Sequence, residues 1–84
     1  AGVQDNLSER DQVLFDALRL WRTETAKARG VPPYVIFHDS TLQEMCVLLP
    51  QSITEFARLG GVGERKLEKY GTDFLQVINQ HLTA

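Results

Sequence analysis

Cysteine and long apolar runs are scarce in this sequence of 84 residues, and each scarcity excludes a class of protein. The single cysteine, Cys46, excludes an internal disulfide and favours, weakly, a reducing compartment. No apolar run approaches the roughly 18 residues that a membrane span needs. Residues 1–4 lack the charged and then apolar pattern of a signal peptide. We therefore expect no membrane partner.

Motifs for catalysis are also missing. His38 and His81 lie far apart, and neither has a cysteine or carboxylate at metal-ligand spacing. No Gly-x-x-x-x-Gly-Lys-Ser/Thr sequence is present, so nucleotide hydrolysis by this chain alone is not expected. Cys46 lies on an apolar stripe and is predicted to pack rather than to act as a nucleophile. The sequence predicts a non-enzyme without a metal or other cofactor.

What is present is the composition of one small globular domain, with 43% hydrophobic and 24% charged residues. The net charge of −2 does not indicate a nucleic-acid binder by itself. Residues 30–57 hold no lysine or arginine, whereas residues 58–84 hold four of these cations against three carboxylates. A basic patch must therefore be small, and binding through it weak and sensitive to salt.

Helical periodicity dominates, and strand-like alternation is absent. Ser8 is predicted to cap a first helix and Gly30 to stop it, with the two following prolines preventing its resumption. Trp21 is assigned to the core, so that Trp21→Ala is expected to cost about 3–5 kcal/mol. The predicted inner face comprises Leu14, Ala17, Leu18, Trp21, Thr25 and Ala28.

The middle of the chain predicts an extended connection followed by a second helix. Residues 31–37 form the short apolar connection. The helix is expected to begin around residues 39–41, with Gln43 and Glu44 placed for a capping box, and Pro50 closes it. Its predicted buried stripe is Leu42, Met45, Cys46 and Leu49.

Three further short helices are predicted. Ser52 and Glu55 have capping-box spacing and start the first of them. The next runs from about residue 64 to 70, where Gly71 is expected to end it and Thr72 to cap the last helix. The core positions expected here are Ile53, Phe56, Ala57, Phe74 or Leu75, Ile78 and Leu82. The predicted fold is all-α, a compact bundle of five short helices.

The most informative motif is the stretch Leu59-Gly60-Gly61-Val62-Gly63, which opens onto the fourth helix. Glycine tolerates positive φ and close approach, so a β-branched residue at Gly61 or Gly63 is expected to destabilise the domain or to block a phosphate. With Gly63 as the cap, Val62 and Leu67 have hydrophobic-staple spacing. The spacing resembles the hairpin of helix-hairpin-helix modules, whose first-turn amides favour an anion. The alternative is a tight helix corner without a ligand.

Basic residues surround this turn. Arg65 and Lys69 are i, i+4 neighbours and form one ridge, with Lys66 beside it. Arg58, just before the turn, can join them. The alternative is an ordinary solvated helix face. We predict a nucleic-acid-binding surface made of Arg58, Gly61, Gly63, Arg65, Lys66 and Lys69, together with Tyr34.

Tyr34 follows two prolines, which stiffen the loop and can hold the side chain outward at little entropic cost. An exposed aromatic ring of this kind can stack on an unpaired base. The alternative is that Tyr34 is an aromatic lid on the core. His38 is expected to be a polar loop residue, and His81 to interact with the C-terminal dipole of the last helix.

From residue 14 to residue 82 the chain resembles an HRDC domain, the module named for RecQ-type helicases and ribonuclease D, and most of all that of a bacterial RecQ helicase. The segments that carry the resemblance are Leu18-Arg19-Leu20-Trp21-Arg22, Ala26, Val31-Pro32-Pro33-Tyr34-Val35-Ile36-Phe37, Asp39, Thr41-Leu42, Pro50, Leu59-Gly60-Gly61-Val62-Gly63, Lys66, Tyr70-Gly71 and Phe74-Leu75. We therefore assign residues 8–84 to the domain. Residues 1–7 are expected to be a flexible linker or added cloning residues.

The resemblance implies a monomeric five-helix accessory domain of an ATP-dependent DNA helicase, in the bacterial cytoplasm at the nucleoid, acting in DNA repair and recombination. It implies weak binding of single-stranded or partly duplex DNA and tuning of substrate choice, with the helicase core of the same polypeptide as a second partner. In RecQ members the aromatic residue at the position of Tyr34 and nearby basic residues are implicated in DNA contact. Two alternatives remain: a docking module with little DNA affinity, and the RNA-directed domain of a ribonuclease D.

Overall fold

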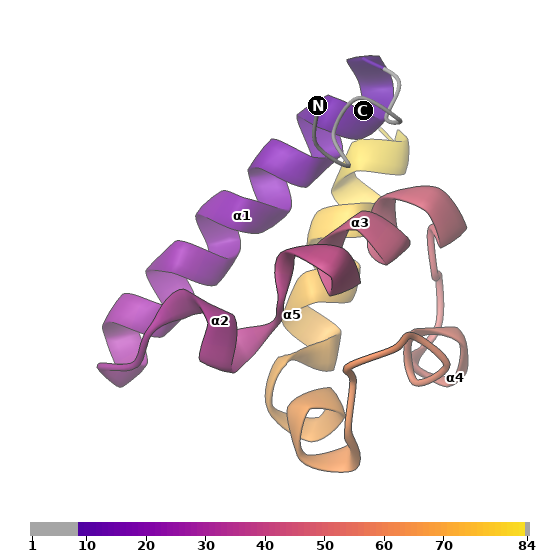
Figure 1. Cartoon of the computed structure of the whole chain (residues 1–84). Helices are drawn as coiled ribbons and strands as arrows, with labels where there is room; N and C mark the ends of the chain where they lie inside the picture. Colours follow the sequence, from indigo (N-terminus) through magenta and orange to yellow (C-terminus); the bar gives the residue numbers. More distant parts are fainter. Residues whose placement is uncertain (1–8, 84) are drawn as a thin grey trace.

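The computed structural model describes residues 9–83, which fold into five helices and the segments that connect them (Figure 1). They are α1 (Glu9–Arg29), α2 (Pro33–Ile36), α3 (Asp39–Leu48), α4 (Ile53–Phe56) and α5 (Glu64–Thr83). No strand occurs in this part of the chain, which confirms the predicted all-α fold. The predicted linker and the predicted cap at Ser8 lie outside the described residues.

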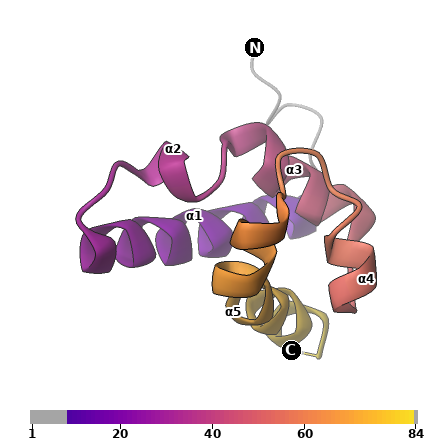
Figure 2. The same cartoon turned by 90° about the horizontal axis from the view of Figure 1, so that it is seen from below.

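The two long helices, α1 and α5, contact each other; α2 and α3 pack on α1, and α4 packs on α5 (Figure 1). The end of α1, all of α2, the glycine turn and the start of α5 lie at the lower end of the molecule in Figure 1. Figure 2 looks at that end directly. Phenylalanines from four segments meet inside the bundle, and none is more than 1% exposed: Phe15, Phe37, Phe56 and Phe74.

The buried side of α1 is rotated from the predicted inner face. Leu14 and Leu18 are buried as predicted, and Thr25 is half-buried. Three other residues are buried without having been predicted: Phe15, Arg22 and Ala26. Three predicted residues are exposed: Ala17, Trp21 and Ala28. The core assignment of Trp21 is wrong, since 40% of the residue is exposed. Helix α1 carries apolar residues on two sides, and α2 and α3 cover the side that includes Arg22. The charge of Arg22 is paired there with Asp39.

The extended connection predicted for residues 31–37 is also wrong in part, because α2 forms one helical turn there. Pro32 is its N-cap in extended conformation, and Pro33 occupies the first turn, where the fixed φ of proline suits a helix. The Val35 N–H donates to the Pro32 carbonyl at 3.0 Å. The two prolines thus start a helical turn instead of only preventing one, and they hold Tyr34 on it.

Helix α3 buries Leu42, Met45 and Cys46 as predicted, whereas the predicted capping box is absent. The N-cap is His38, without a side-chain hydrogen bond. The Glu44 carboxylate instead accepts the Gly60 N–H at 2.8 Å, and the Thr41 hydroxyl donates to the Gly60 carbonyl at 2.9 Å. A side chain placed for a local cap therefore holds a turn 16 residues away.

The predicted cap of α4 is confirmed, since the Ser52 hydroxyl accepts the Glu55 N–H at 3.1 Å. The Glu55 carboxylate returns to the Gln51 N–H. Phe56 is buried as predicted, but Ile53 is 42% exposed. Ala57, also predicted in the core, is the C-cap of α4 and is exposed as well.

The two C-terminal helices predicted on either side of Gly71 are one continuous helix, α5. Gly71 is buried in it, and a Cβ there would meet Leu67 Cδ1 at 3.2 Å and Ile53 Cδ1 at 3.3 Å. Gly71 thus allows α4 to approach α5 closely and does not end a helix. Phe74 and Ile78 are fully buried as predicted, and Leu75 and Leu82 pack partly buried against the core.

Cys46 is buried, as its position on the α3 stripe predicted. Burial, with a smaller contribution from the charge of Asp11, raises the pKa of the Cys46 thiol from 9.0 to about 12. The folded state therefore holds a proton that the unfolded state loses above pH 9.

Below pH 9 the thiol is protonated in both the folded and the unfolded state, so we expect it not to change the free energy of unfolding with pH. Stability should then fall as pH rises from 9 to about 12. Urea titrations across this range test it, with Cys46→Ala as the control that lacks the thiol's share of the decline. Parallel curves for the two proteins would contradict the buried neutral thiol.

Two structural features are absent from residues 9–83. None of their helices combines the length and the apolar character that crossing a membrane requires. No three His, Cys, Asp or Glu side chains among these residues are grouped so as to hold a metal ion.

Candidate nucleic-acid interface

A pair of aromatic rings, Phe37 and Tyr70, joins the segment after α2 to the start of α5. Their centroids lie 6.0 Å apart at an interplanar angle of 74°. Phe37 also packs edge-on against Phe74, at 4.9 Å, and Phe56, at 6.0 Å. The segment after α2 is thereby fixed to α4 and α5.

Two cations rest on these two rings. The Lys66 Nζ atom, from the first turn of α5, lies 5.9 Å from the Phe37 centroid. The Arg29 guanidinium, from the last turn of α1, lies 5.0 Å from the Tyr70 centroid. Cation–π contacts attract and orient such charges. The arrangement brings together positive charges that are 37 positions apart in sequence.

Sequence reasoning missed Arg29. A basic residue in the last turn of a helix is already explained by the helix dipole, so its position gave no reason to assign it to a site. Lys66 was predicted, and it is half-buried rather than fully solvated. Only the contact between Phe37 and Tyr70 places the two cations on neighbouring rings.

The rest of the predicted basic ridge is exposed. Arg65 and Lys69 lie one turn apart on α5, next to the side that carries Lys66 and Tyr70. Leu67 is half-buried and Tyr70 is buried, as predicted for side chains directed to the core. Arg58 follows α4 before the glycine turn and is exposed as well.

The glycine turn is built differently from the prediction at two points. Gly61 has φ +81°, which confirms that the backbone there needs a glycine. Gly63 is not in the left-handed region, and a Cβ there would meet open space, so the prediction for Gly63 is wrong. Gly63 does precede α5 as the predicted cap, because its carbonyl accepts the Leu67 N–H at 2.9 Å. The Gly60 amide is already bound to Glu44. An anion at this turn would therefore use the first-turn amides of α5, and this remains a prediction.

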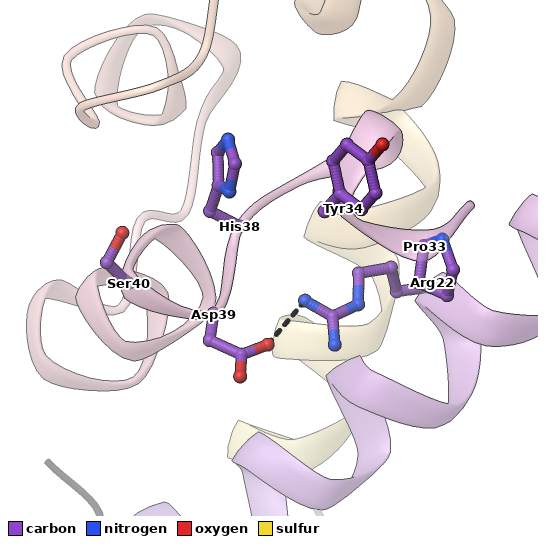
Figure 3. Close-up of a pocket in the computed structure, with 6 residues that line it drawn as sticks. All are labelled: Arg22, Pro33, Tyr34, His38, Asp39 and Ser40. Atoms are coloured by element: carbon purple, nitrogen blue, oxygen red, sulfur yellow. Dashed lines mark hydrogen bonds and ion pairs between the residues drawn. The ribbon is translucent and has the colours of Figure 1, made fainter. Parts of the chain in front are cut away.

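Tyr34 is 60% exposed, which excludes the alternative that it is a lid on the core. Its ring is stacked with that of His38, with centroids 6.3 Å apart and an interplanar angle of 24°. Both rings border an open groove of about 580 Å³, whose remaining lining residues are Arg22, Pro33, Asp39 and Ser40 (Figure 3).

An ion pair lies beneath the two rings in this view (Figure 3). Arg22 Nη1 donates to Asp39 Oδ1 at 2.6 Å and to the Phe37 carbonyl at 3.0 Å. The Arg22 side chain is 9% exposed and that of Asp39 is 63% exposed. The pair joins α1 to the start of α3 and offers a carboxylate to the groove.

This geometry agrees with what comparison with known proteins shows. The family model described as the HRDC domain matches residues 11–78. The chain belongs to the HRDC family. Its fold is also that of the third HRDC domain of D. radiodurans RecQ, with a TM-score of 0.85, 34% sequence identity and coverage of 92% of this chain and 100% of that one.

HRDC-containing relatives of this chain are ATP-dependent DNA helicases. RecQ of Haemophilus influenzae is 38% identical over 93% of the chain, and RecQ of Bacillus subtilis is 45% identical over 89%. UvrD2 of Mycobacterium tuberculosis is 44% identical over 81%. The matched segments make up only 13%, 12% and 10% of those proteins. The HRDC chain thus corresponds to a small part of a helicase polypeptide.

Proposed function

We propose that this HRDC domain is a non-catalytic accessory domain that binds single-stranded or partly duplex DNA weakly and tunes the substrate choice of a RecQ-type helicase. The observation that carries the proposal is the pair of cations, Arg29 and Lys66, seated on neighbouring aromatic rings at the end of the molecule that also exposes Tyr34. Cations bind backbone phosphates, and an exposed ring stacks on a base.

The charge pattern explains why the binding should be weak. The whole chain carries −2, so no long-range attraction draws DNA to it. Only a few phosphates can be neutralised by Arg29, Lys66 and the exposed ridge of Arg65 and Lys69. With two to four contacts, log K should fall against log salt concentration with a slope of about −1.5 to −3.

Removing either seated cation tests the phosphate contacts. Lys66→Ala and Arg29→Ala should each weaken binding to all sequences alike and flatten the salt slope by about 0.7, the release of one counterion from a single strand. Fluorescence anisotropy with a labelled single strand, repeated at several salt concentrations, measures both effects.

The matched control is Arg19→Ala. Arg19 also lies over a ring, that of Phe15 at 5.7 Å, but it precedes Arg29 by ten residues, roughly 15 Å along α1. Arg19→Ala removes the same charge as Arg29→Ala and should leave the salt slope nearly unchanged. Equal effects of all three variants would show that net charge, and not this site, governs binding.

Tyr34→Ala tests the stacking contact separately. It should lose about 1–3 kcal/mol of binding free energy with the salt slope unchanged, because stacking releases no counterions. Because Tyr34 is exposed, the substitution should leave the fold intact, and a thermal melt checks this. Unchanged affinity in a folded Tyr34→Ala protein would remove the aromatic residue from the site.

A docking function has its own observation in its favour. Helix α1 exposes apolar side chains on the side away from the core: Val13 at 62%, Leu20 at 63% and Trp21 at 40%. Such a face suits contact with another protein surface, including the helicase core of the same polypeptide. Leu20→Glu should leave DNA binding by the isolated domain unchanged and weaken docking. If instead Lys66, Arg29 and Tyr34 variants all keep wild-type affinity, docking is the better account.

The wider setting follows from the same proposal. The helicase core would supply ATP hydrolysis, and the domain would act as a monomeric unit within that polypeptide during DNA repair and recombination. The place of action would be the bacterial cytoplasm, at the nucleoid.

A further inference from the structure

Two aromatic rings border the groove at a centroid spacing close to that needed to hold one planar ring between them. The Tyr34 and His38 rings are nearly parallel, at 24°, and their centroids lie 6.3 Å apart. A ring inserted between two others makes contacts of about 3.5 Å on each face, so the two outer rings need about 7 Å. Both residues are exposed, so their side chains can separate by this small amount. Figure 3 shows the two rings next to each other, above the Arg22–Asp39 ion pair.

One polar group that such a ring would meet is the Asp39 carboxylate, an acceptor. Arg22 Nη1 donates its hydrogen bonds to the Phe37 carbonyl and to Asp39 Oδ1. Arg22 Nε is buried without a hydrogen-bond partner. Asp39 is largely exposed, and among the described residues only its Oδ1 atom is bound. A carboxylate repels phosphate and a carbonyl oxygen, and it accepts a hydrogen bond from an amino group.

We propose that Tyr34 and His38 clamp one unpaired base of single-stranded DNA, and that Asp39 selects a base that carries an amino group, cytosine over thymine. The inference rests on the proposed DNA binding and deepens it. Cytosine presents its N4 amino group where thymine presents O4, and carboxylates accept from cytosine N4. The Asp39 carboxylate does not attract phosphates, whereas Lys66 and Arg29 do.

Two labelled homopolymers of equal length, one of deoxycytidine and one of thymidine, test the selection by anisotropy titration of the whole chain at low salt. The wild-type domain should bind the cytidine strand about three- to tenfold more tightly, as one hydrogen bond allows. Asp39→Asn should abolish this ratio. Equal affinity of the wild type for the two strands would overturn the selection by Asp39.

Two substitutions at His38 test the clamp. His38→Ala should weaken binding to both strands about five- to tenfold, whereas His38→Phe, which keeps a ring, should retain wild-type affinity. These variants leave the Arg22–Asp39 pair intact, so they remain informative if Asp39→Asn unfolds. Wild-type affinity in a folded His38→Ala protein would overturn the clamp.

The outcomes separate this inference from the proposed function. If His38→Ala and the choice of strand have no effect, while Lys66→Ala and Arg29→Ala still flatten the salt slope, the clamp is wrong and the domain still binds DNA. If neither strand binds at low salt, both proposals are overturned.

Discussion

Phe37→Ala should bring the domain to the margin of folding at 37 °C. Phe37 is completely buried and packs edge-on against three other rings, so its loss opens a cavity among α2, α4 and α5. Truncation of a buried phenylalanine costs about 3–5 kcal/mol, while a whole domain is stable by about 5–15 kcal/mol and small domains lie at the lower end. Circular dichroism melts measure the loss.

The control for this prediction is Trp21→Ala, which removes an even larger aromatic side chain. Because Trp21 is 40% exposed, we expect a loss of only about 1 kcal/mol, or roughly 4–8 °C in Tm for a domain of this size. This value replaces the cost of a core residue that the sequence pattern implied. If Trp21→Ala destabilised the domain more than Phe37→Ala, the observed burial of α1 would be contradicted.

Gly61→Val should be the second severe substitution, with a loss of about 2–4 kcal/mol. Gly61 has φ +81°, where a β-branched residue is strained by about 1–3 kcal/mol. Its Cβ would also lie 2.6 Å from the Thr41 hydroxyl oxygen. That hydroxyl must then move and give up its bond to the Gly60 carbonyl, a further loss of about 1 kcal/mol.

Gly63→Ser is the matched control two positions later. A Cβ there meets nothing within 4 Å, and serine is a preferred N-cap for the helix that follows. We expect a change within about 0.5 kcal/mol, in the stabilising direction. Urea unfolding of both variants checks the pair. Equal destabilisation by the two substitutions would show that the turn needs both glycines, as the sequence motif alone suggested.

Local signals in the sequence were sufficient for several elements. Gly30 ends α1, Ser52 caps α4 and Gly63 precedes α5, each through interactions within a few residues. The apolar stripe of α3 is long enough to define its buried side. The family resemblance then supplied the arrangement of the helices, which periodicity cannot give.

The candidate site was predictable only in part. The two prolines before Tyr34 pointed to an outward ring, and the structure exposes it. His38 is only four residues from that ring, but the sequence predicted an extended connection where α2 forms a helical turn. Nothing local placed Arg29 beside α5, because that contact depends on how α1 and α5 meet. Glu44 was read as a cap for its own helix, and a turn 16 residues away uses it instead.

The sequence by itself determined the all-α class and the helix boundaries at Gly30, Ser52 and Gly63, because short-range sterics and local hydrogen bonds control these features. Tertiary structure alone decided that Trp21 faces outward while Arg22 is buried, and that Gly71 lies inside a helix. A helical period shows which residues share a face. Which of two such faces is covered depends on the packing and charge pairing that residues distant in sequence bring to it.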